Sequence, residues 1–428
     1  MAKRSRPLGL SKSRKQQKTS SSKENGENEK EKSTTPQLNI ELEENENADN
    51  VTVQLIGLWN SYLNSSRDSD ALLNGIVNEC DTLLSNKDGS GESLKKDDQF
   101  LAVFALALSE LTIFNVKKIH EYFEDSLDII NLFTEEKHTD ILNVVESKII
   151  FQRIPLEYIS KLEEDSSTKI DVNLSKLIEL GQLKFKSMIK LISDNKYQNH
   201  KFINGLIIEN ISIFNDLIDI VENFGSKKNL DEGLDSEVES DAEDENEEIV
   251  QLKPNHPLYK IQQNLTHLAK WLRIEMTKFL PNLTKETKQY YYMSKLIGES
   301  FLKESEFFSE TYLQMAYGDD DDEDDEEEMD NETIHASQKE SIELITKAIE
   351  YLTKAQDPEN ADSWAQLAEA YIDLGNVQDN ESTEQERSYK EAEQILQKAN
   401  IASHNKYQYI LDNLNSDSLS KEVENTNI

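Results

Sequence analysis

Apolar residues recur at helical spacing from residue 51 onward. Leu55, Leu58, Trp59, Tyr62 and Leu63 follow one another at intervals that place them on one side of a helix. The polar residues Asn60 and Ser61 fall between them, which is typical of a helix with one buried face. The pattern predicts that the folded part of the chain begins with an amphipathic helix.

The same periodicity predicts further helices, while strand signals are scarce. After a second helix capped by Ser69 or Asp70, the expected segments are 100–114, 116–133, 140–163, 173–193, 202–224, 258–280 and 284–317. Segment 100–114 is apolar nearly all round, so we expect it to be a central helix. Pro155 should kink or divide the helix that contains it, because proline lacks the backbone N–H that helices require.

Residues 348–399 resemble a tetratricopeptide repeat, a helix pair of about 34 residues with large and small apolar residues at set positions. The matching positions are Trp364, Leu367, Ala368 and Tyr371 in the first helix, and Ala392, Leu396 and Ala399 in the second. Small residues allow two helices to approach closely, and the large ones fill the space between pairs. The segment predicts a binding scaffold, with an ordinary amphipathic hairpin as the alternative.

The ends of these helices are also marked in the sequence. Gly375 and Asn376 should end the first helix, and Pro358 should lie in the turn before it. The match departs from the repeat pattern at residues 355–358, which are about two residues short. It departs again at residues 377–388, which form an insert before Tyr389.

In such a pair the first helix lines the concave surface of the array. The inward positions on this helix would be Asp362, Ala365, Glu369, Ile372 and Asp373. The three carboxylates predict a groove that prefers a segment bearing Lys or Arg. The alternative is that this last pair closes the array with a polar outer face.

Charge strengthens the expectation of protein partners. The formal net charge is −38 at pH 7. Residues 319–328 are ten consecutive acids, and residues 235–248 contain nine more. An acidic body repels phosphate backbones, so direct nucleic-acid binding is not expected. The acidic runs are either solvated segments or docking strips for a basic partner.

The domain organisation follows from these patterns. We expect a disordered basic and polar tail at 1–50, a helical-repeat domain at 51–414, and a disordered tail at 415–428. The acidic segments 226–250 and 318–332 should interrupt the domain as loops, because mutually repelling carboxylates do not pack. The predicted fold class is all-α, an irregular tetratricopeptide-like helical-repeat array.

Candidate chemistry is sparse. The chain contains no Gly-rich phosphate loop, HExxH or Gly-x-Ser-x-Gly motif. The single cysteine, Cys80, lies between two acids that should raise its pKa. The histidines are scattered, and His256 and His267 are expected at the surface. We expect no enzyme activity, cofactor or metal site. There is also no apolar run long enough for a membrane span and no secretory signal, which predicts an intracellular protein.

Two segments suggest regulation. The N-terminus carries seven basic residues and no acidic ones up to residue 18, which predicts a nuclear localisation signal, with a solvated basic tail as the alternative. These residues are Lys3, Arg4, Arg6, Lys12, Arg14, Lys15 and Lys18. Ser236 and Ser240 have acids at the +1 and +3 positions, which predicts phosphorylation by an acidophilic kinase.

Several stretches resemble the fungal enhancer of translation termination family. They are the basic opening at residues 1–12, the segment LNGIVNECD at 73–81 and the segment ALALSELTIF at 105–114. The acidic interruptions and the region around Trp364 fit as well. The resemblance covers about residues 1–400, but its motifs carry no chemistry of their own.

This resemblance implies a nuclear, all-helical protein that promotes accurate translation termination, with shuttling to the cytoplasm left open. It further implies a protein partner, namely a 2-oxoglutarate- and Fe(II)-dependent prolyl hydroxylase-type dioxygenase linked to hypoxic gene expression, together with termination-linked factors. The alternative function is an acidic chaperone for histones or ribosomal proteins.

Overall fold

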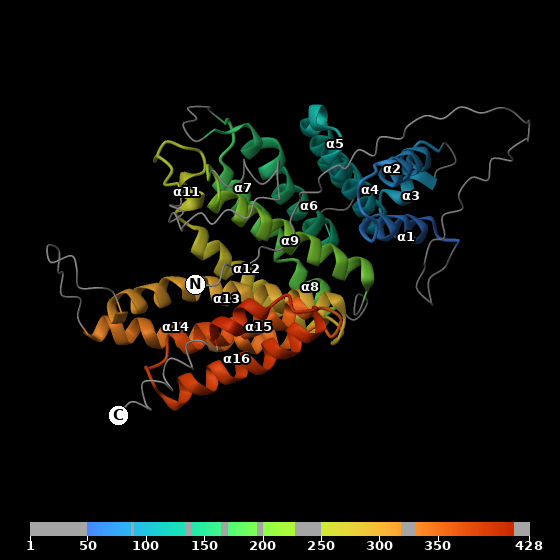
Figure 1. Cartoon of the computed structure of the whole chain (residues 1–428). Helices are drawn as coiled ribbons and strands as arrows, with labels where there is room; N and C mark the ends of the chain where they lie inside the picture. The colour runs from blue at the N-terminus through green and yellow to red at the C-terminus, as the bar shows by residue number, and fades with distance from the viewer. Residues whose placement is uncertain are drawn as a thin grey trace, which may run out of the picture. The chain divides into compact units, whose positions relative to one another are not determined.

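The computed structural model describes residues 49–86, 90–133, 139–163, 170–194, 200–226, 250–317 and 331–414. All regular structure within these ranges is helical, without a strand (Figure 1). The prediction of an all-α fold is therefore confirmed. Across the same ranges, no helix combines the length and the apolar character that crossing a membrane requires. The basic tail, the two serines proposed as phosphorylation sites and most of both acidic segments lie outside the described residues.

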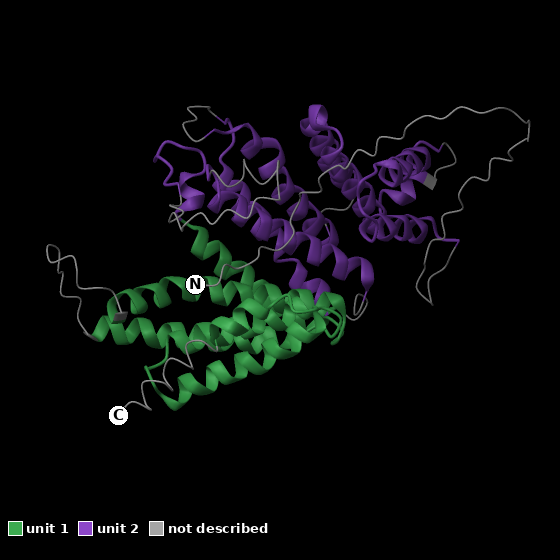
Figure 2. Ribbon diagram, in the orientation of Figure 1, with its two compact units in different colours: residues 1–3, 194–199, 264–428 green, residues 4–193, 200–263 purple. Residues whose placement is uncertain are grey.

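The helices divide into two compact units, which Figure 2 shows in different colours. The division falls between Gln263 and Asn264 and not at either acidic segment. The apolar spacing predicted one helix at 258–280, whereas the structure has α11 (Tyr259–Gln262) and α12 (Leu265–Phe279) on either side of this point. We call the unit of residues 4–193 and 200–263 the N-terminal unit, and the unit of residues 1–3, 194–199 and 264–428 the C-terminal unit.

The N-terminal unit is organised around one buried helix. Its other main helices are α1 (Val51–Leu63), α2 (Ala71–Leu84), α3 (Ser90–Leu94), α5 (Ile119–Asn131), α6 (Asp140–Arg153), α7 (Leu174–Phe185), α8 (Met188–Ser193) and α9 (Lys201–Glu222). The buried helix α4 (Asp98–Glu110) packs against α1, α2, α5 and α6. Every residue from Phe100 to Glu110 is buried, as the nearly all-round apolar character of this segment predicts, and Ser109 and Glu110 are its polar members.

The start of α4 is fixed by a capping aspartate. The Asp97 carboxylate accepts hydrogen bonds from the backbone N–H groups of Gln99 and Phe100, both at 3.1 Å. Its other oxygen accepts from the Thr52 hydroxyl of α1 at 2.7 Å. One side chain therefore satisfies the free N–H groups of the helix start and joins two helices.

Pro155 divides its helix, as predicted. The regular α-helix α6 ends at Arg153, and a π-helical turn follows over Ile154–Tyr158. Proline cannot donate the hydrogen bond that would continue the α-helix, and its ring crowds the preceding turn. A π-turn accommodates the missing bond without ending the helical path.

The C-terminal unit contains two long antiparallel hairpins in addition to α12. The first pairs α13 (Lys288–Tyr317) with α14 (Asn331–Lys354), and the second pairs α15 (Ala361–Asn376) with α16 (Thr383–Ala402) (Figure 1). Contacts between α14 and α15 stack one hairpin on the other. This arrangement is that of a short helical-repeat array.

The predicted insert before Tyr389 is shorter than expected. Helix α16 begins at Thr383, with the Ser382 hydroxyl accepting from the Gln385 N–H at 3.1 Å. The non-helical part is therefore residues 377–382, because a capping serine starts the helix early. Helix α15 ends at Asn376, where the sequence predicted its end.

Candidate protein-binding site

The repeat-like residues of the second hairpin pack in two directions. Leu367 belongs to a core cluster with residues of α13 and α14, including Leu302, Ile345 and Leu352. Ala368 belongs to a second cluster on the other side of the hairpin. The members of that cluster are Ala365, Ala368, Ala392, Leu396, Ala399, Tyr407, Ile410 and Leu411, with Trp364 and Tyr371 packed against it. The structure thus brings all seven predicted packing residues into these two clusters.

The chain's own C-terminal segment covers one side of this hairpin. Tyr407, Ile410 and Leu411 are buried in the second cluster although they lie beyond α16. The Asn400 side chain fixes the segment, because its amide oxygen accepts from the Tyr407 N–H at 3.0 Å and its amide nitrogen donates to Gln408 at 2.9 Å. The array therefore does not end on a bare apolar face.

The three predicted groove carboxylates have different surroundings. Asp362 accepts hydrogen bonds from the Lys406 ammonium at 2.9 Å and from the Tyr407 hydroxyl. The hydrogen bond from Lys406 is the main cause of a lowered pKa of the Asp362 carboxyl. Glu369 and Asp373 lie further along α15 and are partly exposed. The structure thus pairs the first carboxylate with the chain's own C-terminal segment.

The first hairpin follows the same repeat pattern, which the sequence analysis detected only in part. Ile297, Gly298 and Phe301 of α13 have the spacing of Leu367, Ala368 and Tyr371. At the end of α14, Ala348, Leu352 and Ala355 have the spacing of Ala392, Leu396 and Ala399, and all three are buried. Ile297 and Gly298 match the repeat pattern in the sequence. The match is hard to detect because Ser294 stands at the tryptophan position and because the acidic segment separates the two helices in the sequence.

A glycine allows the closest approach in this first hairpin. A Cβ atom on Gly298 would lie 2.7 Å from Leu352 Cγ and 3.2 Å from the Ala348 carbonyl oxygen. The repeat pattern places glycine at this position for the same reason, which is that two helix backbones come near one another there. The residue is a packing determinant that the sequence analysis missed.

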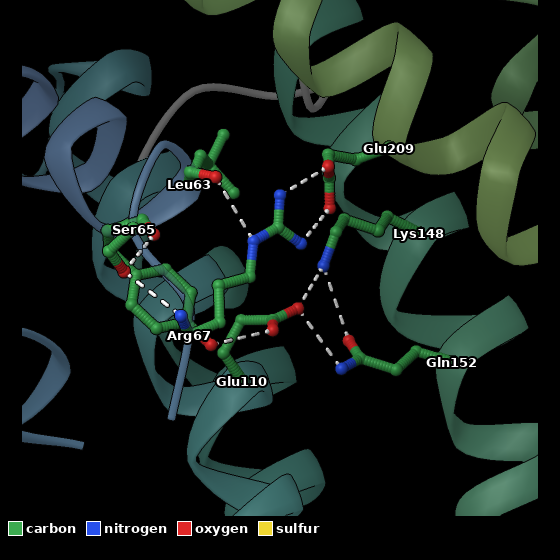
Figure 3. Close-up of polar contacts among 8 residues, drawn as sticks. Leu63, Ser65, Arg67, Glu110, Lys148, Gln152 and Glu209 are labelled. Carbon is green, nitrogen blue, oxygen red and sulfur yellow. Dashed lines mark hydrogen bonds and ion pairs between the residues drawn. The ribbon is translucent and has the colours of Figure 1, made fainter. Parts of the chain in front are cut away.

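The N-terminal unit contains a buried ionic network that links several helices (Figure 3). The Lys148 ammonium of α6 lies 2.6 Å from a carboxylate oxygen of Glu110 in α4, and both side chains are nearly inaccessible. Gln152 and Tyr62 also donate to Glu110, at 3.1 and 3.3 Å. Burial alone would raise the pKa of the Glu110 carboxyl, but the Lys148 charge holds it below its ordinary value.

A second ion pair lies beside this network. The Arg67 guanidinium meets the Glu209 carboxylate of α9 through two hydrogen bonds of 3.0 and 2.8 Å (Figure 3). Both networks hold helices together, and every charged group in them has a partner. They therefore join helices of the N-terminal unit through charged groups that are already paired with one another.

The remaining candidate side chains are structural. Cys80 is fully buried, and burial followed by the charges of Asp81 and Glu79 raises the pKa of its thiol, as predicted. The expectation of a surface position is wrong for His256, which is buried and packs on Phe224. Within the described ranges, no cluster of histidine, cysteine and carboxylate side chains is arranged to hold a metal ion.

The chain is similar to fungal proteins along almost its whole length. The family model described as "Nuclear pore complex subunit Nro1" matches residues 1–415. The protein of Saccharomyces cerevisiae (strain S288c) named "Enhancer of translation termination 1" is 41% identical over 379 residues, which cover 85% of this chain and 87% of that protein. A protein of the same name from Vanderwaltozyma polyspora is 42% identical over 384 residues, covering 86% of this chain and 87% of the relative.

Solved structures share the fold at much lower identity. The "Structure of S. pombe nuclear import adaptor Nro1" has a TM-score of 0.51 and 11% identity, and the match covers 82% of this chain and 94% of that one. A second structure, "The hypoxic regulator of sterol synthesis Nro1 is a nuclear import adaptor", has a TM-score of 0.50 at 11% identity, covering 81% and 88% of the two chains. Because a family model spans nearly the whole sequence and relatives share about two fifths of their residues with it, the chain belongs to the fungal Nro1 and enhancer of translation termination family.

Proposed function

We propose that this chain is a nuclear, non-enzymatic adaptor that promotes accurate translation termination. The observation that carries the proposal is the 41% identity to the S. cerevisiae protein named "Enhancer of translation termination 1". The description of the family as a nuclear pore complex subunit, and of the S. pombe structure as a nuclear import adaptor, supports nuclear action through protein partners.

The finer proposal is that the partner is a 2-oxoglutarate- and Fe(II)-dependent prolyl hydroxylase-type dioxygenase, and that the chain influences hypoxic gene expression. The family resemblance of the sequence supports this identity of the partner. The description of the second structural neighbour as a hypoxic regulator of sterol synthesis supports the link to hypoxia.

Complementation tests the function in cells. In S. cerevisiae lacking the related gene, expression of this chain should restore accurate termination, measured with a stop-codon readthrough reporter. Purification of the chain from the same cells should recover a dioxygenase and termination-linked proteins. Unchanged readthrough with normal expression would reject the proposal.

The proposed contact for a basic segment of the partner is formed by Glu369 and Asp373, which are partly exposed on α15. Charge reversal in the double variant Glu369→Lys/Asp373→Lys should weaken binding of the purified partner, because like charges oppose one another across an interface. Glu343→Lys, at an exposed position of α14, is the matched control. If the double variant and the control bound the partner with equal affinity, the last helix pair would only close the array and would not bind the partner.

Import and modification are proposed for segments outside the described residues. Replacing Lys3, Arg4 and Arg6 by alanine should shift a fluorescent fusion toward the cytoplasm. Treatment with an acidophilic kinase should add phosphate at Ser236 and Ser240, detected by intact mass and lost in the double alanine variant. A nuclear fusion or an unchanged mass would refute the respective assignment.

The acidic segments favour a second candidate function, a chaperone for histones or ribosomal proteins. Ten consecutive acids at 319–328 would shield a basic client by charge alone. Deleting 235–248 and 319–332 together discriminates between the candidates. A chaperone would lose its client, and binding would be labile to salt, whereas a packed adaptor surface would keep its partner at high salt.

A further inference from the structure

Helices α7 and α8 contain more basic than acidic residues, whereas the chain as a whole is strongly acidic. The sequence has 84 acidic and 46 basic residues. Between Leu174 and Ser193, however, it has four lysines and a single acid, Glu179. The lysines are Lys176, Lys184, Lys186 and Lys190. A local surplus of positive charge on a strongly acidic protein marks this helix pair as electrostatically distinct.

The same helix pair exposes large apolar side chains. Leu183 is 61% exposed, Leu180 39% and Ile189 41%. Lys176, Leu180 and Leu183 are spaced i, i+4 and i+7, so they share one side of α7. We call the exposed positions Lys176, Leu180, Leu183, Lys186, Ile189 and Lys190 the α7–α8 face.

The opposite side of α7 is tightly held. A Cβ atom on Gly181 would lie 2.4 Å from the Phe151 ring of α6, so the two helices are in close contact there. The Ser147 hydroxyl donates to the Gly181 carbonyl at 2.8 Å, and the Lys184 ammonium lies 2.7 Å from Glu146. The α7 part of the face is therefore presented in a fixed orientation, which lowers the entropic cost of binding.

The lysines of the face remain available to a partner. Lys190 makes only an exposed ion pair of 3.3 Å with Asp140. Lys176 and Lys186 are exposed and form no ion pair with another residue of the described ranges. Apolar residues beside lysines complement an amphipathic helix with aliphatic residues on one side and carboxylates at its flanks.

We propose that the α7–α8 face binds an acidic amphipathic helix of a protein partner. The inference rests on the proposed adaptor function and adds the chemistry of one partner segment. Leucine-type side chains of that helix cover Leu180, Leu183 and Ile189, and its carboxylates meet Lys176 and Lys186. A nucleic acid fits less well, because it has no aliphatic side chains to cover Leu180, Leu183 and Ile189.

Peptide binding to the full chain tests this assignment. The probe is a synthetic helical peptide of about 20 residues with Leu at i, i+4, i+7 and i+11 and Glu at the flanking positions. Fluorescence anisotropy should detect binding to the unmodified chain, and the same peptide with Lys in place of Glu should not bind. Leu183→Ser and Lys186→Glu should each weaken binding by about tenfold, which is about 1.4 kcal/mol. The first variant removes an apolar contact, and the second places a like charge opposite the Glu side chains of the peptide.

Matched variants separate this face from general surface effects. Ile220→Ser alters a comparably exposed apolar residue of α9, and Lys117→Glu alters an exposed lysine elsewhere in the same unit. Both should leave the affinity unchanged. Equal loss in these controls, or undiminished binding in the face variants, would overturn the proposal.

Two further experiments identify what binds the α7–α8 face. A chain lacking residues 227–249 should bind the peptide with unchanged affinity, whereas a large gain would mean that this acidic segment of the chain occupies the face. Binding to anionic vesicles with no binding to the peptide would assign the face to a membrane. Either result would overturn the partner-helix assignment. The stop-codon readthrough reporter tests the termination function independently. Absence of peptide binding would therefore reject the α7–α8 face as a binding site and would not reject the termination function.

Discussion

At the residue scale, the Lys148–Glu110 pair shows how a charge can be tolerated in the core. The two groups are 2.6 Å apart and almost fully buried. Gln152 and Tyr62 supply further hydrogen bonds to the carboxylate. Such a pair contributes little net stability when it is intact, but removing one partner leaves the other as an uncompensated buried charge.

Replacing the lysine of this pair should therefore be strongly destabilising. We expect Lys148→Met to lower the free energy of unfolding by about 3–5 kcal/mol. Lys118→Met removes an exposed ion pair of 3.8 Å with Glu121 and should change it by less than about 1 kcal/mol. Urea denaturation followed by circular dichroism measures both. If Lys148→Met lowered the free energy of unfolding as little as Lys118→Met, the buried pairing of Lys148 with Glu110 would be contradicted.

A glycine substitution tests the close approach of α13 and α14. Because a Cβ atom at Gly298 would meet Leu352 and the Ala348 backbone, Gly298→Ala should destabilise the chain by about 1–3 kcal/mol. Gly75 in α2 has nothing within 4 Å of its Cβ position. Gly75→Ala should be stabilising by about 0.5–1 kcal/mol through helix propensity. Thermal denaturation measures both changes. A melting temperature of Gly298→Ala that rises, as is expected for Gly75→Ala, would refute the contact.

The pH dependence of stability should include a contribution from Glu157. Burial would raise the pKa of this carboxyl, but hydrogen bonds from Arg153 and His120 hold it below its ordinary value. A lowered native pKa stabilises the fold above the unfolded pKa of about 4.3, and this contribution is lost as the pH falls through the native value. The stability difference between wild type and Glu157→Gln should shrink from pH 6 to pH 3. Glu92→Gln, at an exposed ion pair, is the control.

At the element scale, the last helices show what closes the array. The segment after α16 buries Tyr407, Ile410 and Leu411 against α15 and α16. Covering a terminal repeat in this way prevents an apolar face from meeting water. The sequence left two alternatives open for this end of the chain, and the contacts of Asp362 with Lys406 and Tyr407 favour closure at the start of α15.

The closing segment makes a prediction with an internal control. Ile410→Ala should lower the free energy of unfolding by about 2–4 kcal/mol and increase amide hydrogen exchange in α15 and α16, because it empties a buried site. Ile401→Ala removes the same atoms from a side chain that is 79% exposed and should have little effect. Equal exchange in the two variants would mean that the segment does not protect the hairpin.

Helix boundaries were predictable where the chain carries local signals. Pro155 and Asn376 mark their helix ends because proline lacks a donor and a Gly-Asn pair favours termination. The break between α11 and α12 was not predictable, since apolar spacing continues through it. The first hairpin was only partly detected, because Ser294 stands where the repeat pattern has tryptophan and no local feature replaces it.

At the scale of the whole molecule, each hydrophobic cluster of the repeat region lies within one unit. Among the described residues, the members of both hairpin clusters and the side chains packed against them lie between 301 and 411. The C-terminal unit thus contains the apolar contacts that its hairpins need. Its separation from the N-terminal unit at Gln263 and Asn264 coincides with a break between helices.

We therefore expect a fragment of residues 264–414 to fold on its own. It should be helical by circular dichroism and unfold cooperatively in urea. A fragment of residues 331–414 is the comparison. It lacks Leu302 and Tyr312 of α13, which complete the first cluster, and should unfold without a cooperative transition. Cooperative unfolding of the shorter fragment would show that α13 is not required.

The sequence by itself determined the helical class, the central helix, the repeat-like hairpin and the acidic character, because periodicity and composition are local properties of a chain. Only the tertiary structure decided which charges are neutralised and which faces are covered. Asp362 is occupied by Lys406, His256 is buried, and Lys148 pairs with Glu110 across two helices. These outcomes depend on residues far apart in sequence, and only folding brings such residues together.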